Sequence, residues 1–296
     1  MPLREILALL LLAAIWGGSF MFMRVAAPEF GIFALVEVRT VLATLVLLPV
    51  LLLRRQLADV RRFFWPIFAI GAINTAIPFA LFNFSSLHLE AGVNAILNAT
   101  APMFGALIAF IWLQEKLSKV AILGLLLGFA GVAVISEQKL HGGQLTLAPI
   151  LAACGATACY GLAACMMKRY LQGVKPLAVA AGSQAMASVM LLPLALATWP
   201  AVNPSTHAWL NAVALAVAGT GIAYLLYFHL IASVGPSKAI TVAYLVPLFG
   251  ILWGLVLLNE SLSAQALAGG ACILVGVAMT TGVTRLFARR GFAPAK

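Results

Sequence analysis

The motif PMFG at 102–105, followed by LQEKLS at 113–118, occurs twice in this chain. It returns as PLFG at 247–250 and LNESLS at 258–263, displaced in both cases by 145 residues (247 − 102 and 258 − 113). Two separate matches at one displacement indicate a duplicated structural unit rather than chance similarity.

The same duplication extends to the N-terminal part of the chain. Trp16-Gly17 corresponds to Tyr160-Gly161, and Pro49 corresponds to Pro193, each displaced by 144 residues (160 − 16 and 193 − 49). Since the offset holds almost from end to end, we expect two units of similar structure. Residues 1–140 would form the first and residues 141–296 the second.

The composition is that of a protein embedded in lipid. Hydrophobic residues make up 64% of the 296 residues, charged residues only 9%, and the mean hydropathy is +1.08. An average soluble domain is about 25% charged, so we predict an all-α integral membrane protein. The net charge of +10 would suggest nucleic acid in a soluble domain. Here the basic residues lie between apolar runs, where they orient the chain in the membrane, and no nucleic-acid partner is expected.

Ten apolar runs are long enough to cross a bilayer, which takes about 20 helical residues. They lie near 5–27, 32–53, 64–86, 91–113, 118–136, 146–168, 175–197, 208–231, 237–258 and 264–286. The first run continues beyond the length of a signal peptide and has a partner in the repeat, so we interpret it as an uncleaved helix. Because each copy then has five spans, the copies must cross the membrane in opposite directions.

The basic residues predict the orientation. With the N-terminus in the cytoplasm, only Arg24 and Lys139 fall outside, and Arg39 lies within the second span. The basic residues on the cytoplasmic side are then Arg4, Arg54, Arg55, Arg61, Arg62, Lys116, Lys119, Lys168, Arg169, Lys175, Lys238, Arg285, Arg289, Arg290 and Lys296. Positively charged loops stay inside, so both termini are expected in the cytoplasm.

Three prolines within the apolar runs predict hinges. A proline inside a helix removes one backbone hydrogen bond and displaces the carbonyl four residues earlier. Pro78, Pro102 and Pro247 are the candidates. Asn74 and Asn98 each precede one of these prolines by four residues, so each would place a carboxamide beside a freed carbonyl. Either the two asparagines bind a polar solute near the membrane centre, or they satisfy their own helices and neighbours.

Polar and aromatic side chains near the middle of several runs suggest a shared cavity among the first, third, fourth, sixth, eighth and ninth spans. Trp16 and Tyr160 occupy equivalent places in the two copies. For each single aromatic residue, core packing or anchoring at the membrane surface is the more common role. The candidate substrate-binding residues are Trp16, Ser19, Asn74, Phe79, Asn83, Asn94, Asn98, Tyr160, Tyr224, His229 and Tyr244.

Charged groups within the apolar runs are few. Glu37 and Arg39 are two residues apart on the second run, about 200° around a helix, so they do not face one cavity. Arg24 is a possible partner for Glu37, since buried ions are usually paired. The repeated Glu115 and Glu260 lie where a span ends, and we expect them to cap the next helix or to anchor the chain at the surface.

Signatures of catalysis and of cofactor binding are missing from the sequence. Asp59 is the only aspartate, and neither HExxH nor GxSxG occurs. The four cysteines lie in apolar runs without metal-ligand spacing. We therefore expect no enzyme activity, no metal site and no cofactor.

The combined pattern resembles the drug/metabolite transporter superfamily in its EamA-type branch. The resemblance rests on Pro-x-Phe-Gly, Leu-x-Glu-x-Leu-Ser and a glycine-spaced last helix in each copy, at Gly124 to Gly131 and Gly269 to Gly276. It covers nearly the whole chain and implies a cavity that opens alternately to each side. Two positions of the second copy depart from the first: Ser183 stands opposite Arg39, and Ala223 opposite Pro78.

The resemblance implies an exporter of amino acids or similar small metabolites in the bacterial inner membrane. Within that branch, the chain is most similar to broad-specificity exporters that include aromatic amino acids among their solutes. Export of other drugs or metabolites, and a channel-like or scaffold protein without transport, are the alternatives. Two oligomeric states are consistent with the sequence: a monomer, or a homodimer formed through the small-residue helix faces.

Overall fold

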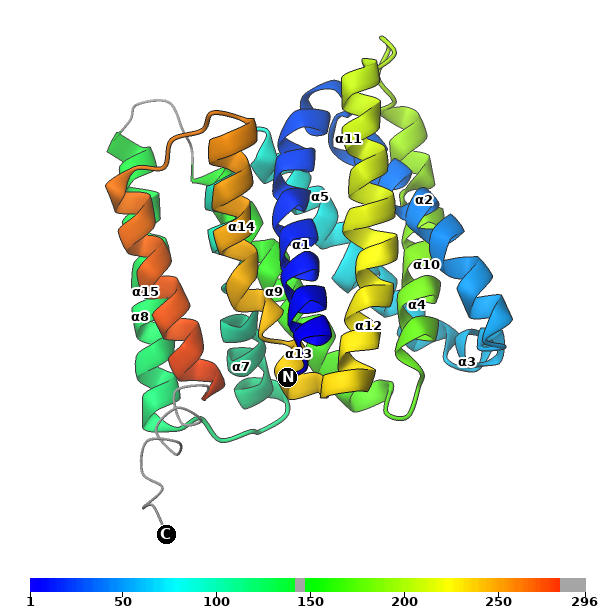
Figure 1. Ribbon diagram of the computed structural model, residues 1–296, viewed down its shortest axis with the longest axis horizontal. Helices are drawn as coiled ribbons and strands as arrows, with labels where there is room; N and C mark the ends of the chain where they lie inside the picture. Colours follow the sequence, from blue (N-terminus) through cyan, green and yellow to red (C-terminus); the bar gives the residue numbers. More distant parts are fainter. Residues whose placement is uncertain (142–146, 283–296) are drawn as a thin grey trace.

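The computed structural model describes residues 1–141 and 147–282, and they form a bundle of helices (Figure 1). Four of the predicted basic residues, Arg285, Arg289, Arg290 and Lys296, lie outside the described residues. The helices are α1 (Leu3–Phe30), α2 (Ile32–Leu53), α3 (Leu57–Arg62), α4 (Phe64–Gly71), η1 (Ala72–Ala76), α5 (Ile77–Ser86), α6 (Ala91–Asn98), α7 (Ala101–Trp112), α8 (Lys119–His141), α9 (Ala148–Tyr170), α10 (Pro176–Ala197), α11 (Thr206–Ala216), η2 (Val217–Ile222), α12 (Ala223–Val234), α13 (Pro236–Ala239), α14 (Val242–Leu257) and α15 (Ala264–Thr281).

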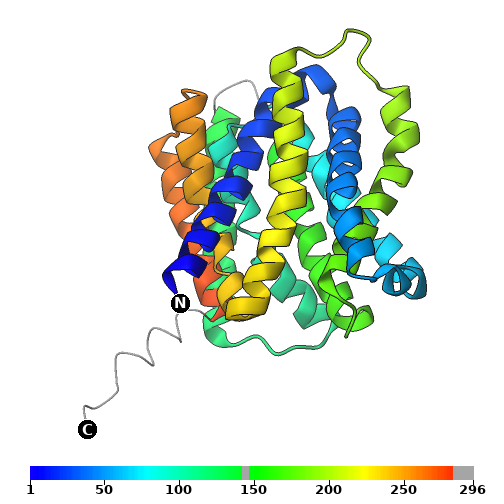
Figure 2. The same ribbon diagram turned by 45° about the vertical axis from the view of Figure 1, so that its right-hand side comes forward.

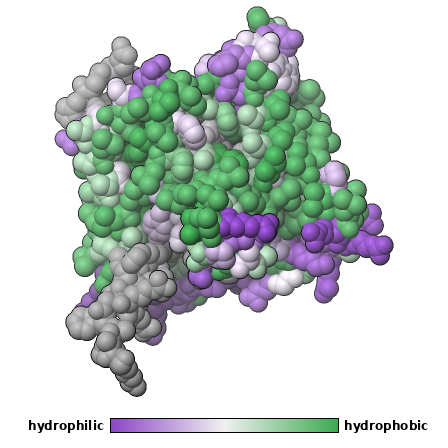
Figure 3. Space-filling view, in the orientation of Figure 1, coloured by the Kyte–Doolittle hydropathy of each residue, from purple (hydrophilic) through white to green (hydrophobic). Residues whose placement is uncertain are grey.

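These elements make up the ten predicted membrane spans. In the described part of the chain, nine helical stretches are long and apolar enough to cross a bilayer, and Val242–Leu257 is a shorter apolar helix. The third span, Phe64–Ser86, combines α4, η1 and α5, and the fourth, Ala91–Trp112, combines α6 and α7. A broad hydrophobic band covers the middle of the visible face, and hydrophilic residues gather at its edges (Figure 3). The chain is a multi-pass membrane protein, as predicted.

The helices run up and down between two faces. The N-terminus, the α7–α8 connection and the end of α15 lie at one face, which we call the N-terminal face; the α14–α15 connection lies at the opposite face (Figure 1). The connection from α10 to α11 also crosses that opposite face (Figure 2). In the interior, α1 packs against α14, α9 packs against α5 and α7, and α2 packs against α10.

Glycines permit the closest of these contacts, and they come in equivalent pairs. A methyl group on Gly17 of α1 would lie 2.7 Å from the backbone nitrogen of Gly250 on α14. A methyl group on Gly161 of α9 would lie 2.5 Å from the nitrogen of Gly105 on α7. Each contact joins one copy of the repeat to the other, so the two copies interlock through the same pair of positions. The glycine-spaced faces of α8 and α15 likewise pack against each other within the chain.

The repeated LQEKLS and LNESLS motifs fold in the same way. Gln114 and Asn259 both adopt the left-handed conformation, with φ of 57° and 53°. In the next residue, the amide of Glu115 donates to the carbonyl of Ala109, and that of Glu260 donates to Gly254, at 3.2 and 3.0 Å. The duplication seen in the sequence therefore extends to single backbone hydrogen bonds.

Pro78, Pro102 and Pro247 all lie in spans with an irregular helical segment, but the position of the proline relative to that segment differs. Pro78 lies directly after the π-helical segment η1, and Pro102 follows a break at residues 99–100 between α6 and α7. Pro247 instead lies inside continuous α14, whose span is interrupted earlier, at residues 240–241. The second copy forms the equivalent π segment, η2, although Ala223 replaces the proline. A proline at this position is therefore not required for a π segment.

Candidate substrate cavity

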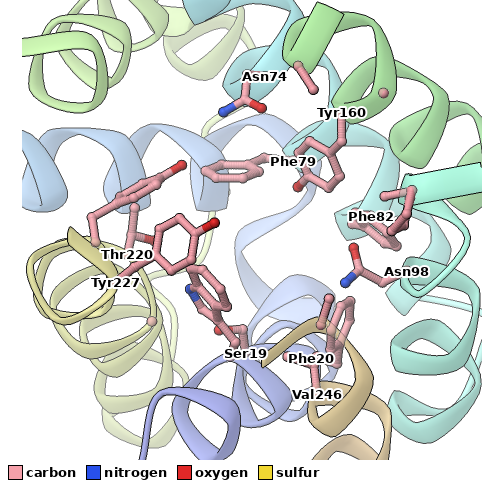
Figure 4. Close-up of a pocket in the computed structure, with 18 of the residues that line it drawn as sticks. Ser19, Phe20, Asn74, Phe79, Phe82, Asn98, Tyr160, Thr220, Tyr227 and Val246 are labelled. Carbon is pink, nitrogen blue, oxygen red and sulfur yellow. The ribbon is translucent and has the colours of Figure 1, made fainter. Parts of the chain in front are cut away.

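A cavity of about 440 Å³ lies where the two copies meet. Its volume is within the range of about 300 to 1,000 Å³ that is usual for small-molecule sites. Side chains from α1, α5, α6, α9, η2 and α14 converge on it (Figure 4). It is lined by Trp16, Ser19, Phe20, Met23, Arg39, Asn74, Phe79, Phe82, Asn98, Ala101, Pro102, Gly105, Tyr160, Gly161, Ala164, Met167, Gly219, Thr220, Tyr224, Tyr227, Ile240, Ala243 and Val246. The spans predicted to surround a cavity do so, together with the second span.

Seven of the predicted site residues lie in this wall. They are Trp16, Ser19, Asn74, Phe79, Asn98, Tyr160 and Tyr224. Asn98, at the end of α6, makes no side-chain hydrogen bond to another described residue, and its carboxamide points into the cavity (Figure 4). Ser19 donates to the carbonyl of Ile15 on its own helix, at 3.2 Å. Asn98 therefore keeps its full hydrogen-bonding capacity for a solute.

The other four predicted site residues lie outside the wall. Asn83 is fully buried and donates to the carbonyl of Ile32 at 3.0 Å. Asn94, also fully buried, bonds the hydroxyl groups of Ser85 and Ser86. These two asparagines join helices to each other instead of lining the cavity, although Asn83 Oδ1 has no hydrogen-bond partner among the described residues.

The remaining two, His229 and Tyr244, have partners near the N-terminal face. His229 Nε2 lies 3.3 Å from Glu5 Oε2 in the first turn of α1. The Tyr244 hydroxyl contacts Thr281 at the end of α15. Glu5 also accepts from Ser233 at 2.8 Å, so it is a second buried carboxylate within a span besides Glu37.

The cavity wall is built from equivalent positions of the two copies. Trp16 faces it with its counterpart Tyr160, Phe79 with Tyr224, and Phe82 with Tyr227, at displacements of 144, 145 and 145 residues (160 − 16, 224 − 79 and 227 − 82). The Trp16 and Tyr227 rings lie 5.3 Å apart, and those of Phe82 and Tyr160 lie 6.1 Å apart. Aromatic side chains thus enclose the site from both copies.

Arg39 is a charged lining residue that was not among the predicted site residues. It comes from α2, is only 8% exposed, and its Nε donates to the hydroxyl of Thr220 in η2 at 2.9 Å. Its guanidinium carbon lies 3.5 Å from the centroid of the Phe79 ring. Two features of the sequence pointed to Arg39 as a site residue. It is a charge within a predicted span, and it has no acidic partner on its own helix face.

The predicted partnership of Arg24 with Glu37 is wrong. Glu37 instead accepts from the hydroxyl of Ser188 on α10, at 2.7 Å. Arg24 pairs across the repeats with Glu260, at 3.5 Å, and also donates to the carbonyls of Ser86 and Leu87. Arg24 and Glu260 are 236 positions apart in the sequence (260 − 24). Residue spacing along a single helix therefore does not predict this pair.

Glu260 also caps a helix, although not the next one as predicted. Its Oε2 accepts from the backbone nitrogen of Ala91 at the start of α6, at 2.9 Å, whereas Ser263 caps the following α15. Burial raises the pKa of the Glu260 carboxyl, outweighing the opposite effects of Ala91 and Arg24.

Below the Arg24–Glu260 pair, the rings of Phe20 and Phe82 stack edge to face and are only 5% and 2% exposed. The cavity is closed on the α14–α15 face.

A corresponding pair lies at the N-terminal face. Lys168, near the end of α9, contacts Glu115 in the connection that follows α7. These side chains are 64% and 45% exposed, against 34% and 13% for Arg24 and Glu260. The cavity wall reaches Met167, next to Lys168, and Ile240, which is 51% exposed. The cavity therefore extends toward the N-terminal face.

Comparison with known sequences identifies the fold family. The profile of the EamA-like transporter family matches the chain twice, over residues 3–137 and 147–282. The chain belongs to the EamA-like transporter family. Its two five-span repeats, inverted relative to each other, are the two family units, and the molecule is a transporter of that family.

Several relatives align over nearly the full length. The uncharacterized transporter YvbV of Bacillus subtilis is 26% identical over 279 residues, covering 93% of this chain and 91% of its own. A probable terminal-alkyne amino-acid exporter of Streptantibioticus cattleyicolor is 28% identical over 282 residues, covering 93% and 92%. The uncharacterized inner membrane transporter YedA of Escherichia coli K12 is 27% identical over 285 residues, covering 93% and 90%. A crystal structure that covers 96% of this chain and 98% of its own superposes with a TM-score of 0.66 at 19% identity, which shows the same fold.

Proposed function

We propose that this EamA-like protein is a secondary transporter, not an enzyme, that exports amino acids or similar small metabolites across the bacterial inner membrane by alternating access. The observation that carries the proposal is the aromatic cavity shared by equivalent positions of the two repeats. In inverted-repeat transporters the solute binds near the membrane midplane, at the interface of the repeats. A solute bound there can be exposed to either face by rocking one repeat against the other.

The wall chemistry suits an amino acid. The aromatic rings of Trp16, Tyr160, Tyr224 and Tyr227 offer faces for an apolar or aromatic side chain, and for an ammonium group through cation–π attraction. The free carboxamide of Asn98 both donates and accepts hydrogen bonds. Because most of the wall is apolar, it accepts side chains of varied shape, which supports broad specificity.

The two ion pairs between the repeats support alternating access. If both termini lie in the cytoplasm, as we propose, the cavity faces inward and the Arg24–Glu260 pair closes its outer side. Opening outward requires that pair to separate, while Lys168 and Glu115 become enclosed in turn. Pro78, Pro102 and Pro247 mark the helix irregularities at which we expect the spans to bend.

The Streptantibioticus relative, a probable amino-acid exporter, supports amino acids as the solute class. Export of other drugs or metabolites fits the same apolar wall, whereas flux through a channel-like protein would not saturate with solute concentration.

We propose that the two rocking units divide near residue 140.

Flux through purified protein in proteoliposomes tests the proposal. Uptake of labelled phenylalanine should saturate and should be inhibited by other amino acids. The double variant Trp16→Ala with Asn98→Ala should lower this flux by at least about tenfold, since it removes one aromatic face and one hydrogen-bonding group. Trp65→Ala with Asn211→Ala is the matched control, because Trp65 is 73% exposed and Asn211 bonds its own helix.

The outcomes separate the alternatives. Flux that rises linearly with concentration would indicate a channel. An unchanged rate in the Trp16 and Asn98 double variant would remove both residues from the site. No flux of any solute in a broad metabolite panel would contradict the transporter proposal.

A further inference from the structure

The strongest unexplained feature of the cavity is the charge on Arg39. Its Nε is bonded to Thr220, its Nη1 lies 3.9 Å from the sulfur of Met23, and its Nη2 has no hydrogen-bond partner among the described residues. No carboxylate in the described part of the chain pairs with it. A guanidinium in an apolar interior normally has an acidic partner, because burying an unpaired charge is unfavourable.

The nearest acidic residue in the sequence does not neutralise Arg39. Glu37 is two residues away, which places it on another side of α2, and it bonds Ser188 of α10. The Phe79 ring stabilises the cation by facing it, but carries no net charge. The positive charge therefore stays uncompensated at the cavity wall.

We propose that Arg39 binds the carboxylate of the solute, and that the amine of the solute is dispensable. This inference rests on the proposed transport function and narrows it to carboxylic acids with an apolar or aromatic body. Guanidinium groups bind carboxylates through two parallel hydrogen bonds. The unbonded Nη2 provides a donor for such a contact.

The number of charges in the wall limits the solute further. Among the described residues that line the cavity, Arg39 is the only lysine or arginine, and Ser183 occupies the corresponding position of the second copy. One cation matches one carboxylate, whereas phosphorylated solutes would call for more. None of the lining residues that the structure describes is an aspartate or glutamate, so an ammonium group gains no ion pair from them. Cation–π attraction to the aromatic rings offsets only the cost of taking the ammonium group out of water, so a solute whose nitrogen is acylated should bind about as well as the free amino acid.

Four phenylalanine derivatives separate the contributions of the two charged groups. Phenylalanine has both charges, N-acetylphenylalanine only the carboxylate, phenylalaninamide only the ammonium, and N-acetylphenylalaninamide neither. Calorimetry on the full chain in lipid nanodiscs should give the two carboxylates similar Kd values. Each amide should bind roughly 30-fold or more weakly than its acid, which is the usual effect of losing one partner of a buried charge pair. Equal binding of acids and amides would overturn the proposal.

Two variants test Arg39 itself. Arg39→Met should abolish the preference for acids over amides, while Arg39→Lys should keep part of it because the charge remains. If Arg39 mainly binds solute, Arg39→Met should unfold at the same temperature as the native protein or higher, since it removes an uncompensated charge. A preference for acids that persists in Arg39→Met would contradict the assignment.

Failure of this inference is distinguishable from failure of the transport proposal. Saturable phenylalanine flux with no discrimination between acids and amides would overturn the role of Arg39 and leave the transporter standing. Absence of flux for all four compounds and for the metabolite panel would contradict transport itself.

Discussion

The two ion pairs that join the repeats use equivalent residues in unlike surroundings. Arg24 corresponds to Lys168 and Glu260 to Glu115, at displacements of 144 and 145 residues (168 − 24 and 260 − 115). The glycine contacts beside them, at Gly17 and Gly161, are equivalent too. The most direct difference is burial: the side chains of Arg24 and Glu260 are 34% and 13% exposed, against 64% and 45% for Lys168 and Glu115.

The buried pair has additional hydrogen bonds. Glu260 accepts from the amide of Ala91, and Arg24 donates to two carbonyls at the end of α5. The position equivalent to Ala91 in the second copy is Pro236 (91 + 145), and proline has no amide hydrogen to donate. The sequence itself therefore excludes the same cap at the other end. The two repeats are thus held together more strongly by the Arg24–Glu260 pair at the α14–α15 face than by the Lys168–Glu115 pair at the N-terminal face.

The largest effect should come from removing the two acids in turn. Glu260→Ala leaves Arg24 without its carboxylate and Ala91 without its cap, so we expect the free energy of unfolding to fall by about 2 to 3 kcal/mol. Glu115→Ala removes an exposed, solvent-screened pair and should lower the free energy of unfolding far less. Denaturant unfolding in micelles measures both. Equal losses would show that the two closures do not differ in strength.

Exchanging the charges sharpens the same comparison. Lys168→Glu combined with Glu115→Lys should recover most of the stability lost by either single change, because that pair depends on charge alone. Arg24→Glu combined with Glu260→Arg should remain about 1 kcal/mol or more below the native protein, since arginine cannot accept from the Ala91 amide. Full recovery in the second exchange would mean that the helix cap is unimportant.

The pH dependence of the buried closure should be smaller but specific. Burial raises the pKa of Glu260 above its ordinary value of 4.5, and the neighbouring charged groups are Arg24 and Glu90. The ion pair is therefore present above that raised pKa and is lost as the pH falls through it, earlier than for an exposed glutamate. Mild acid should weaken the closure.

Labelling of a buried site reports this opening. In a background without the four native cysteines, Ser86→Cys lies next to the Arg24 contact. Its reaction with a membrane-impermeant thiosulfonate, compared with a free thiol at each pH, should accelerate severalfold as the pH falls through the raised pKa of Glu260. Glu260→Gln should be fast at every pH, since it imitates the protonated acid. Parallel pH profiles in both proteins would exclude Glu260 as the titrating group.

The sequence predicted the spans and the symmetry because both depend on local composition and on a constant offset. The ten apolar runs and the two LQEKLS-like turns are of this kind. It also brought Trp16, Asn98 and Tyr160 into one wall, because equivalent positions of inverted repeats meet at their shared axis.

What the sequence did not predict depends on contacts between distant segments. Asn94 resembles Asn98 in spacing, yet its partners Ser85 and Ser86 turn it into a link between helices. The Arg24–Glu260 pair joins the end of the first span to the end of the ninth, and no local sequence pattern indicates this pairing. Arg39 was visible as an intramembrane charge, but its place in the wall follows from the packing of α2 against η2.

The π segments η1 and η2 carry a consequence for the history of the chain. Each accommodates a wider turn than an α-helix, both begin at equivalent residues, Ala72 and Val217, and only the first is followed by proline. A wide turn acquired separately by each half would have no reason to start at the same register. The shared register is what duplication of a unit that already contained the wide turn would produce, with the two halves diverging in proline content afterwards.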